Sequence, residues 1–409
     1  MKKIGIFTTF YDFNRAYSLC SVVYDQLVAH VKRGYKPVLF VLESFKDDAS
    51  VPEGVEIRKI VPQIILEPYK GLEYPENYLE DVEKVKKALK EHAQDIEIMI
   101  VHDMVFIDTY LPYNIALREA GLPCKYLHWI HSAPSPRPNL EDNPHANRYT
   151  LPPNSKLVYL NNDKALALAE MYGTWLRNVK VVHNSRDPRT FWDLDPFVST
   201  LIDKYDILSA DIISVYPVSS TRMVDGKQID VAIRIHEELR KLGYKTKLII
   251  PNAHANGQKE KNEVAKRANN NVIFTSTQGQ EYEQGVSSKI VSDLFRLSNI
   301  FIFPSISENC SLVLLEAMLS GNLLILNKDC SGLQEFGGVN AVYLKMGNLD
   351  NGIRNEEVAL GEESYIRDIA KIIISEFEQN KPLQAKRRAL QEFNYEHIMD
   401  KIETLYYDN

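Results

Sequence analysis

One segment, Asn299 to Asn327 (NIFIFPSISENCSLVLLEAMLSGNLLILN), constrains the fold more than any other part of the chain. It opens with an apolar run, Ile300 to Phe303, whose short length and aromatic and β-branched residues predict a buried parallel strand. After a polar loop, residues 311–319 have a helical composition that closes at Gly321, and residues 323–326 predict a second strand. Such β-loop-α-β units bind ligands at the carboxyl ends of their strands, where the helix N-terminus presents free N–H groups.

Two carboxylates, Glu308 and Glu316, bracket the loop and the helix of this segment. They stand eight residues apart, a little over two helical turns, so they would not touch if the whole span were helical. With Glu308 on the loop and Glu316 inside the helix, both can face one ligand. A lone glutamate is ordinarily a solvated surface residue, but this pair, with the sequence around it, predicts a binding site.

The sequence SENCSLVLLEAMLSGNLLIL resembles the E-x7-E signature of the GT-B glycosyltransferases of the retaining, GT4-like group. The resemblance implies that Glu308 approaches the donor sugar and that Glu316 binds the nucleotide ribose. It also implies that the residues after the first glutamate offer backbone N–H groups to the sugar and phosphates; these are Asn309, Cys310, Ser311 and Leu312. The family commonly has Phe-Gly or Gly-Phe where this chain has Asn309-Cys310.

Two cations, Arg222 and Lys227, follow the strand expected at residues 211–218. The family that the chain resembles keeps G-R-L-x-x-x-K-G here, with the arginine and the lysine reaching the donor diphosphate, and the spacing of five residues is retained. Fixed cations suit this chemistry, because breaking a sugar–phosphate bond builds charge on the departing nucleoside diphosphate. The alternative is a solvated pair before the helix expected at residues 229–242.

A further candidate, His131, ends the strand expected at residues 125–131 and precedes a loop rich in proline and serine. A histidine at the end of a buried strand is ordinarily a hydrogen-bonded structural residue. Many GT4-like enzymes have a histidine near the donor sugar at the corresponding strand end, so the resemblance makes His131 a catalytic candidate. His102 and Asp103 end another expected strand and raise the same question.

The chain opens with a strand, a helix and a strand at residues 3–10, 18–31 and 36–42, which is the β-α-β start of a Rossmann-like half. The turn after the first strand, residues 11–17, contains no glycine, whereas GT4-like enzymes usually carry a Gly-rich turn there. It is therefore no dinucleotide fingerprint. Its polar and aromatic side chains are expected to shape an acceptor or sugar pocket.

The resemblance extends over nearly the whole chain and implies an α/β protein of GT-B type, with two Rossmann-like domains facing a central cleft. A length of 409 residues suits two such domains. The tail at 364–407 predicts two helices. The expected domains are an N-terminal acceptor domain (1–187), a linker (188–210), a C-terminal donor domain (211–385) and a C-terminal helix crossing back to the first domain (386–409).

The composition limits the location and the partners of the chain. A net charge of −7 gives no general drive toward nucleic acid or anionic membranes. The four cysteines show no CxxC pairing, so neither disulfides nor a structural zinc site are expected. No run approaches 18 apolar residues, and the apolar run at the N-terminus is too short for a signal peptide. A cytoplasmic protein without a transmembrane segment is expected.

Together these features predict a glycosyltransferase that moves a sugar from a UDP- or GDP-linked donor to an acceptor hydroxyl, with the anomeric configuration retained. The predicted catalytic residues are Glu308, Arg222, Lys227 and His131. The family needs neither a bound metal nor another cofactor, and the literal DxD at 193–195 lies in the expected linker. Front-face attack assisted by the leaving phosphate is favoured over double displacement, because no second candidate carboxylate lies clearly in the N-terminal half.

The acceptor and two other classes of function stay open. A glycan, a lipid-linked sugar or another hydroxyl is the ordinary acceptor, while the aromatic, histidine and arginine content of 11–17 and 128–148 admits a modified nucleic-acid base. The same fold could instead epimerise a nucleotide sugar or serve as a non-catalytic scaffold. A scaffold has no need of all four predicted donor residues, which are Arg222, Lys227, Glu308 and Glu316.

Overall fold

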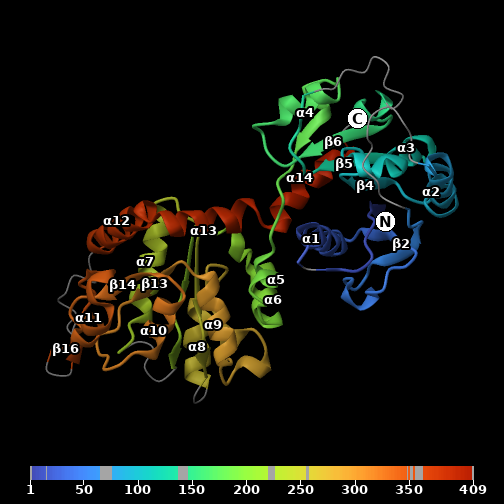
Figure 1. The fold of residues 1–409 in the computed structure, drawn as a ribbon. Helices are drawn as coiled ribbons and strands as arrows, with labels where there is room; N and C mark the ends of the chain where they lie inside the picture. Colours follow the sequence, from blue (N-terminus) through green and yellow to red (C-terminus); the bar gives the residue numbers. More distant parts are fainter. Residues whose placement is uncertain are drawn as a thin grey trace. The chain divides into compact units, whose positions relative to one another are not determined.

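The chain forms two compact units (Figure 1). The first combines Met1–Arg186 with Tyr395–Asn409, and the second is Asp187–Asn394. The computed structural model describes residues 2–14, 16–64, 76–136, 146–219, 226–254, 258–347, 349–350, 353–354 and 363–407. The last described helix therefore belongs to the same unit as the first strand.

The first unit is built on a parallel sheet in the order β3-β2-β1-β4-β5-β6-β7. Each described pairing between neighbours in this order is parallel. The strands are β1 (Lys3–Phe7), β2 (Lys36–Leu42), β3 (Glu56–Val61), β4 (Ile98–His102), β5 (Lys125–Ile130), β6 (Ser155–Tyr159) and β7 (Val179–Val181).

Helices cover both faces of this sheet. Successive strand residues point to opposite faces, and apolar residues on each face pack against helices. On one face, Ile4 and Ile6 of β1 share a core with α1 and with the last helix, α14. On the other face, Phe7 and Phe40 pack with α2 and α3. The helices are α1 (Ser18–Lys32), α2 (Tyr78–His92), α3 (Leu111–Glu119), α4 (Ala165–Met171) and α14 (Tyr395–Tyr407).

The second unit has a parallel sheet in the order β12-β10-β8-β13-β14-β15. The run Ile300 to Phe303 is continuously apolar because both faces of β13 are covered: its isoleucines lie in one core and its phenylalanines in the other. The strands are β8 (Ile212–Val215), β10 (Thr246–Ile250), β12 (Val272–Phe274), β13 (Ile300–Phe303), β14 (Leu323–Asn327) and β15 (Ala341–Leu344).

Two small two-stranded sheets and a larger set of helices complete the second unit. No described helix of the chain is long and apolar enough to span a bilayer. The small strands are β9 (Val218–Ser219), β11 (Asn252–Ala253), β16 (Leu349–Asp350) and β17 (Ile353–Arg354). The helices are α5 (Pro188–Phe191), α6 (Pro196–Tyr205), α7 (Ile229–Lys241), α8 (Gln258–Arg267), α9 (Ser288–Leu297), α10 (Leu312–Leu319), α11 (Ser331–Gly337), α12 (Glu363–Gln379) and α13 (Lys381–Glu392).

Both main sheets have the strand order of a Rossmann fold. When the main-sheet strands of each unit are counted in chain order, each sheet contains the run 3-2-1-4-5-6. The order reverses between β1 and β4 in the first unit and between β8 and β13 in the second. In open parallel sheets, ligands bind outside the carboxyl ends of the strands at this reversal. The predicted pair of Rossmann-like units is confirmed.

Two segments differ from their prediction. Residues 188–210, expected as a linker, form α5 and α6 and lie within the second unit. Each of these helices begins with a proline whose preceding aspartate, Asp187 or Asp195, caps it, and Val198 and Leu201 are buried in the core. The tail forms three helices rather than two, since Asn380 caps a new helix before Pro382.

Candidate functional site

An ion pair joins two of the predicted residues at the strand-order reversal of the second unit. Lys227 Nζ donates to Glu308 Oε1, and Ser305 Oγ donates to the same oxygen at 2.5 Å. The two charged side chains are only 15% and 10% exposed. Glu308 is therefore not a solvated surface carboxylate, and Lys227 is not a solvated lysine before a helix.

The backbone around this pair is held by Gln228, a buried residue that precedes α7. Its φ of 49° lies in the left-handed region. Its Nε2 donates to Pro304 O at 2.6 Å and to Met346 O at 2.8 Å, and Ile306 N donates to Gly226 O at 3.1 Å. The segment carrying Lys227 is thereby tied to the loop that carries Glu308.

A glycine allows α11 to approach the loop that carries Glu308. A Cβ added to Gly332 would lie 2.1 Å from Glu308 O and 3.2 Å from Asn309 O. Real Cβ atoms do not approach backbone this closely, so the close contact requires glycine. The start of α11 therefore packs directly against the peptide after Glu308.

The residues after Glu308 lead into the N-terminus of α10. Ser311 is the N-cap, and its Oγ accepts from Leu314 N at 3.4 Å. Asn309 and Cys310 are exposed, and Leu312 is 70% exposed, so their side chains do not cover this helix end. The free N–H groups of a helix N-terminus favour an anion.

The remaining two predicted donor residues have different outcomes. Glu316 lies inside α10, as predicted, and is half-buried; burial raises the pKa of its carboxyl. Its carboxylate has no hydrogen-bond partner within the described part of the chain. Arg222 lies outside the described residues.

Three buried polar residues that are not among the predicted site residues lie at the carboxyl edge of the same sheet. Asn252 and His254 follow β10, and Ser276 follows β12. Asn252 Oδ1 accepts from Ser276 N at 3.2 Å, while Asn252 Nδ2, His254 Nδ1 and Ser276 Oγ have no partner in the described structure. Polar residues directly after predicted strands were the available signal.

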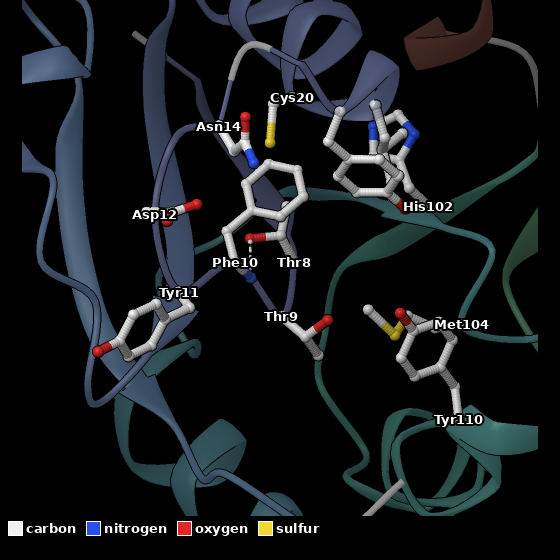
Figure 2. Close-up of a pocket in the computed structure, with 12 residues that line it drawn as sticks. Thr8, Thr9, Phe10, Tyr11, Asp12, Asn14, Cys20, His102, Met104 and Tyr110 are labelled. Carbon is white, nitrogen blue, oxygen red and sulfur yellow. Dashed lines mark hydrogen bonds between the residues drawn. The ribbon is translucent and has the colours of Figure 1, made fainter.

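In the first unit, the glycine-free turn after β1 lines a pocket of about 350 Å³. Figure 2 shows Tyr11 and Asp12 on one side of the pocket and Met104 and Tyr110 on the other. The pocket lies at the strand-order reversal, since Thr8 follows β1 and His102 ends β4. The predicted pocket at this turn is present; its role as an acceptor site stays a prediction.

Beside this pocket, His131 belongs to a chain of hydrogen bonds. His102 Nδ1 lies 2.9 Å from His131 Nε2, and His102 Nε2 lies 3.1 Å from Gln26 Oε1. Because an amide oxygen only accepts, His102 Nε2 carries its proton. His102 Nδ1 is then the acceptor, and His131 Nε2–H donates to it, which leaves the proton-free nitrogen of His131 at Nδ1.

Burial keeps both rings neutral. It lowers the pKa of His131 to about 4 and that of His102 well below its usual range; the repulsion that a protonated His131 would exert is a second cause for His102. Asp103, with φ 55°, accepts from His131 N at 2.8 Å and fixes the backbone there. A neutral imidazole with a free lone pair can accept a hydrogen bond from a hydroxyl.

Comparison with known proteins bears on the second unit. Residues 215–340 match the model of the family described as Glycosyl transferases group 1. No curated protein matches the chain. The chain shares 15% identity with a glycosyltransferase from Rickettsia africae ESF-5, over 99% of this chain and 97% of that one, at a TM-score of 0.37.

Two further solved structures match over nearly the full length of both chains. HepE from Anabaena, in complex with UDP-glucose, shares 16% identity over 100% of both chains, at a TM-score of 0.36. Sucrose-phosphate synthase from Thermosynechococcus elongatus shares 15% identity over 100% of this chain and 98% of that one, also at 0.36. The family match lies within the second unit and spans Lys227, Glu308 and Glu316, and the chain is a glycosyltransferase.

Proposed function

We propose that the chain is a retaining, metal-independent glycosyltransferase that takes a UDP- or GDP-linked sugar and transfers it to a hydroxyl, in the cytoplasm. The observation that carries this proposal is the ion pair of Lys227 and Glu308, supported by Ser305, at the strand-order reversal inside the family match. A largely buried ion pair of this kind suits a site that must bind both a polar sugar and an anionic leaving group.

The donor is proposed to lie along the carboxyl edge of the second sheet. Its diphosphate would contact Lys227, Arg222 and the free N–H groups at the start of α10, which offset the charge that develops on it. Glu308 would bind the sugar and Glu316 the ribose. The unpaired Asn252 Nδ2 and Ser276 Oγ on this edge suit the carbonyl oxygens of a base.

The acceptor is proposed to enter the pocket of the first unit, with His131 accepting a hydrogen bond from a hydroxyl. A glycan or a lipid-linked sugar is the favoured acceptor. The exposed rings of Tyr11 and Tyr17 beside the pocket would also stack on a base, so a modified nucleic-acid base is the second candidate.

Front-face attack is the favoured mechanism. The bond from the anomeric carbon to the leaving phosphate breaks, and the bond to the acceptor oxygen forms on the same face. The acceptor proton passes to the leaving phosphate oxygen. This route needs no enzymatic nucleophile, and Asp103 is engaged by the backbone N–H groups of His131 and Ser132.

The first test is a thermal-shift screen with UDP, GDP, ADP and dTDP sugars, since a ligand of the folded state raises its melting temperature. One nucleotide is expected to stabilise the wild type but not Lys227→Ala or Glu316→Ala. Lys371→Ala, an exposed site on α12, is the matched control and should respond like the wild type. Stabilisation of every variant alike, or of none including the wild type, would contradict the proposed donor site.

The reaction itself needs separate measurements. Slow donor hydrolysis without an acceptor, unaffected by EDTA, is expected of a metal-independent transferase. NMR of the first-formed product is expected to show the anomeric configuration of the donor. Interconversion of the free nucleotide sugar would instead identify an epimerase, and inertness with retained nucleotide binding would identify a scaffold.

A further inference from the structure

The pocket after β1 has an unusual chemical lining for a site that would take phosphorylated ligands. Three tyrosines (Tyr11, Tyr17 and Tyr110) line it together with polar side chains, and the described residues that line it include no lysine or arginine. Its one described carboxylate is Asp12, which is exposed. A phosphate group in this pocket would meet a negative charge.

The unpaired polar groups of the pocket both donate and accept. Thr9 Oγ1, the Asp12 carboxylate and Asn14 Nδ2 have no hydrogen-bond partner among the described residues. Asn14 Oδ1 accepts from Ala16 N at 3.0 Å, so the free amide group is the donor. Thr8 does not belong to this set, because its Oγ1 donates to Phe40 O at 2.8 Å. A hydroxyl acceptor, a carboxylate acceptor and an amide donor match sugar hydroxyls, each of which donates and accepts.

The aromatic rings are placed for contact with the C–H face of a sugar ring. Tyr11 is 42% exposed, and Lys46 Nζ lies 4.7 Å from its ring centroid. Tyr17 is 51% exposed and packs edge-to-face with Phe10, with 6.4 Å between the two ring centroids. Figure 2 shows Tyr11, Asp12 and Asn14 coming from one continuous turn, so one ligand can meet the ring and the polar groups together.

We propose that this pocket binds an uncharged pyranoside, which makes the acceptor a neutral sugar rather than a nucleic acid or a phosphorylated sugar. The role of the bound sugar as acceptor rests on the proposed transferase function, whereas the binding of the sugar rests on the lining of the pocket alone. Tyr11 supplies the stacking surface, and Thr9, Asp12 and Asn14 distinguish among hydroxyl patterns. A nucleic acid needs several cations along its phosphates, whereas Lys46, which lies over the Tyr11 ring, is a single charge beside the described lining.

Saturation-transfer NMR on the full chain tests this proposal without a donor. The probes are the methyl glycosides of glucose, galactose, mannose and N-acetylglucosamine, with glucose 6-phosphate and a single-stranded 12-nucleotide DNA as charged competitors. At least one methyl glycoside is expected to bind more tightly than either charged probe. Tyr11→Ala is expected to weaken it about two- to tenfold, and Asp12→Asn about tenfold or more.

Opposite effects of one substitution on two ligands distinguish altered recognition from misfolding. Asp12→Asn removes a negative charge, so it should weaken the methyl glycoside while strengthening glucose 6-phosphate. Asp163→Asn, an exposed aspartate after β6 that does not line the pocket, should change neither. Arg15 stands in the same turn of the sequence but outside the described residues, and Arg15→Ala should leave glycoside binding within about twofold.

Three results would overturn the inference. One is tighter binding of the DNA or of glucose 6-phosphate than of every methyl glycoside. Another is loss of all binding in Arg15→Ala, and the third is no binding of any glycoside. Because the donor screen probes the second unit, donor hydrolysis without glycoside binding would refute this inference alone. Glycoside binding by a chain that neither binds nor hydrolyses any nucleotide-sugar donor would refute the transferase proposal alone.

Discussion

His131 Nε2 lies 2.9 Å from His102 Nδ1, and Gln26 on α1 determines which of the two rings donates. A residue of the first helix therefore sets the protonation of a strand-end histidine without touching it. His131→Phe is expected to lower the rate of sugar transfer on the order of 100-fold, because the acceptor hydroxyl loses the hydrogen bond that positions it for attack. Nucleotide binding should be unchanged, which a thermal shift with the donor measures.

Gln26 is expected to act as a positioning residue. Gln26→Leu leaves both rings in place but no longer fixes the tautomer, so transfer should fall about tenfold, less than for His131→Phe. Gln26→Glu keeps an acceptor for His102 Nε2–H and should restore most of the rate. Its added charge favours protonated His102, so the acid limb of the pH–rate profile should shift to higher pH. Equal losses in both variants with unchanged profiles would show a packing role instead.

Glu308→Gln is expected to separate binding from turnover. The amide can still accept from Ser305, but it ends the ion pair with Lys227 and the charged contact proposed for the sugar. Loss of a charged hydrogen bond costs about 1.5–3 kcal/mol, so kcat should fall about 10- to 100-fold. Calorimetry with the nucleoside diphosphate should show affinity equal to or above that of the wild type, since Lys227 is released. A large loss of nucleotide affinity with unchanged kcat would contradict the assignment.

Gly332→Ala is expected to disturb the donor site from outside it. Its Cβ would overlap Glu308 O, so either α11 or the loop must move. The loss of donor-induced stabilisation should exceed any fall in the melting temperature of the ligand-free protein. Ser331→Ala, one residue earlier and exposed, is the control and should behave as the wild type in both measurements.

His236 on α7 is expected to make the protein sensitive to acid. It is fully buried, neither ring nitrogen has a partner in the described structure, and burial lowers its pKa to about 3. The unfolded chain binds a proton near pH 6.5. The neutral ring's contribution to stability is thus complete above pH 6.5 and is lost as the pH falls toward 3.

Replacing His236 by methionine tests this dependence. The loss of unfolding free energy between pH 7.5 and pH 5 should be about 2 kcal/mol smaller than in the wild type. At pH 7 the variant should be as stable or more stable, because no hydrogen bond is removed. Urea titrations at both pH values measure this, with the half-exposed His92→Gln as control. An unchanged pH dependence in His236→Met would refute the explanation.

The sequence predicts the apolar and helical periodicities well. The run at 300–303, the helix after Ser311 and the strand at 323–327 occur as expected, because a strand buried on both faces must be apolar throughout. Edge strand β3 was missed, since its sequence EIRKIV exposes charged side chains and lacks that pattern. The segment at 188–210 resembles a linker in its prolines, but those prolines open helices.

The candidate site, too, is predictable from the sequence in part only. Motif spacing leads to Lys227 and Glu308, but not to their direct contact, which depends on Gln228 folding back to Pro304. Gln228 follows no recognisable pattern, because its role arises from a backbone conformation with φ 49°. The link from Gln26 to His131 is likewise invisible, since it joins residues 105 positions apart through a third residue.

The position of α14 in the first unit determines the order in which the two units can finish folding during synthesis. Residues of α14, including Ile398 and Ile402, fill the core beside β1, and Tyr406 bonds His30 of α1. They leave the ribosome only after residues 187–394, so the unit that is made first is completed after the other has been translated. Until then, the apolar surface that α14 will cover stays exposed. The nascent N-terminal unit is therefore the part of the chain that most needs a chaperone.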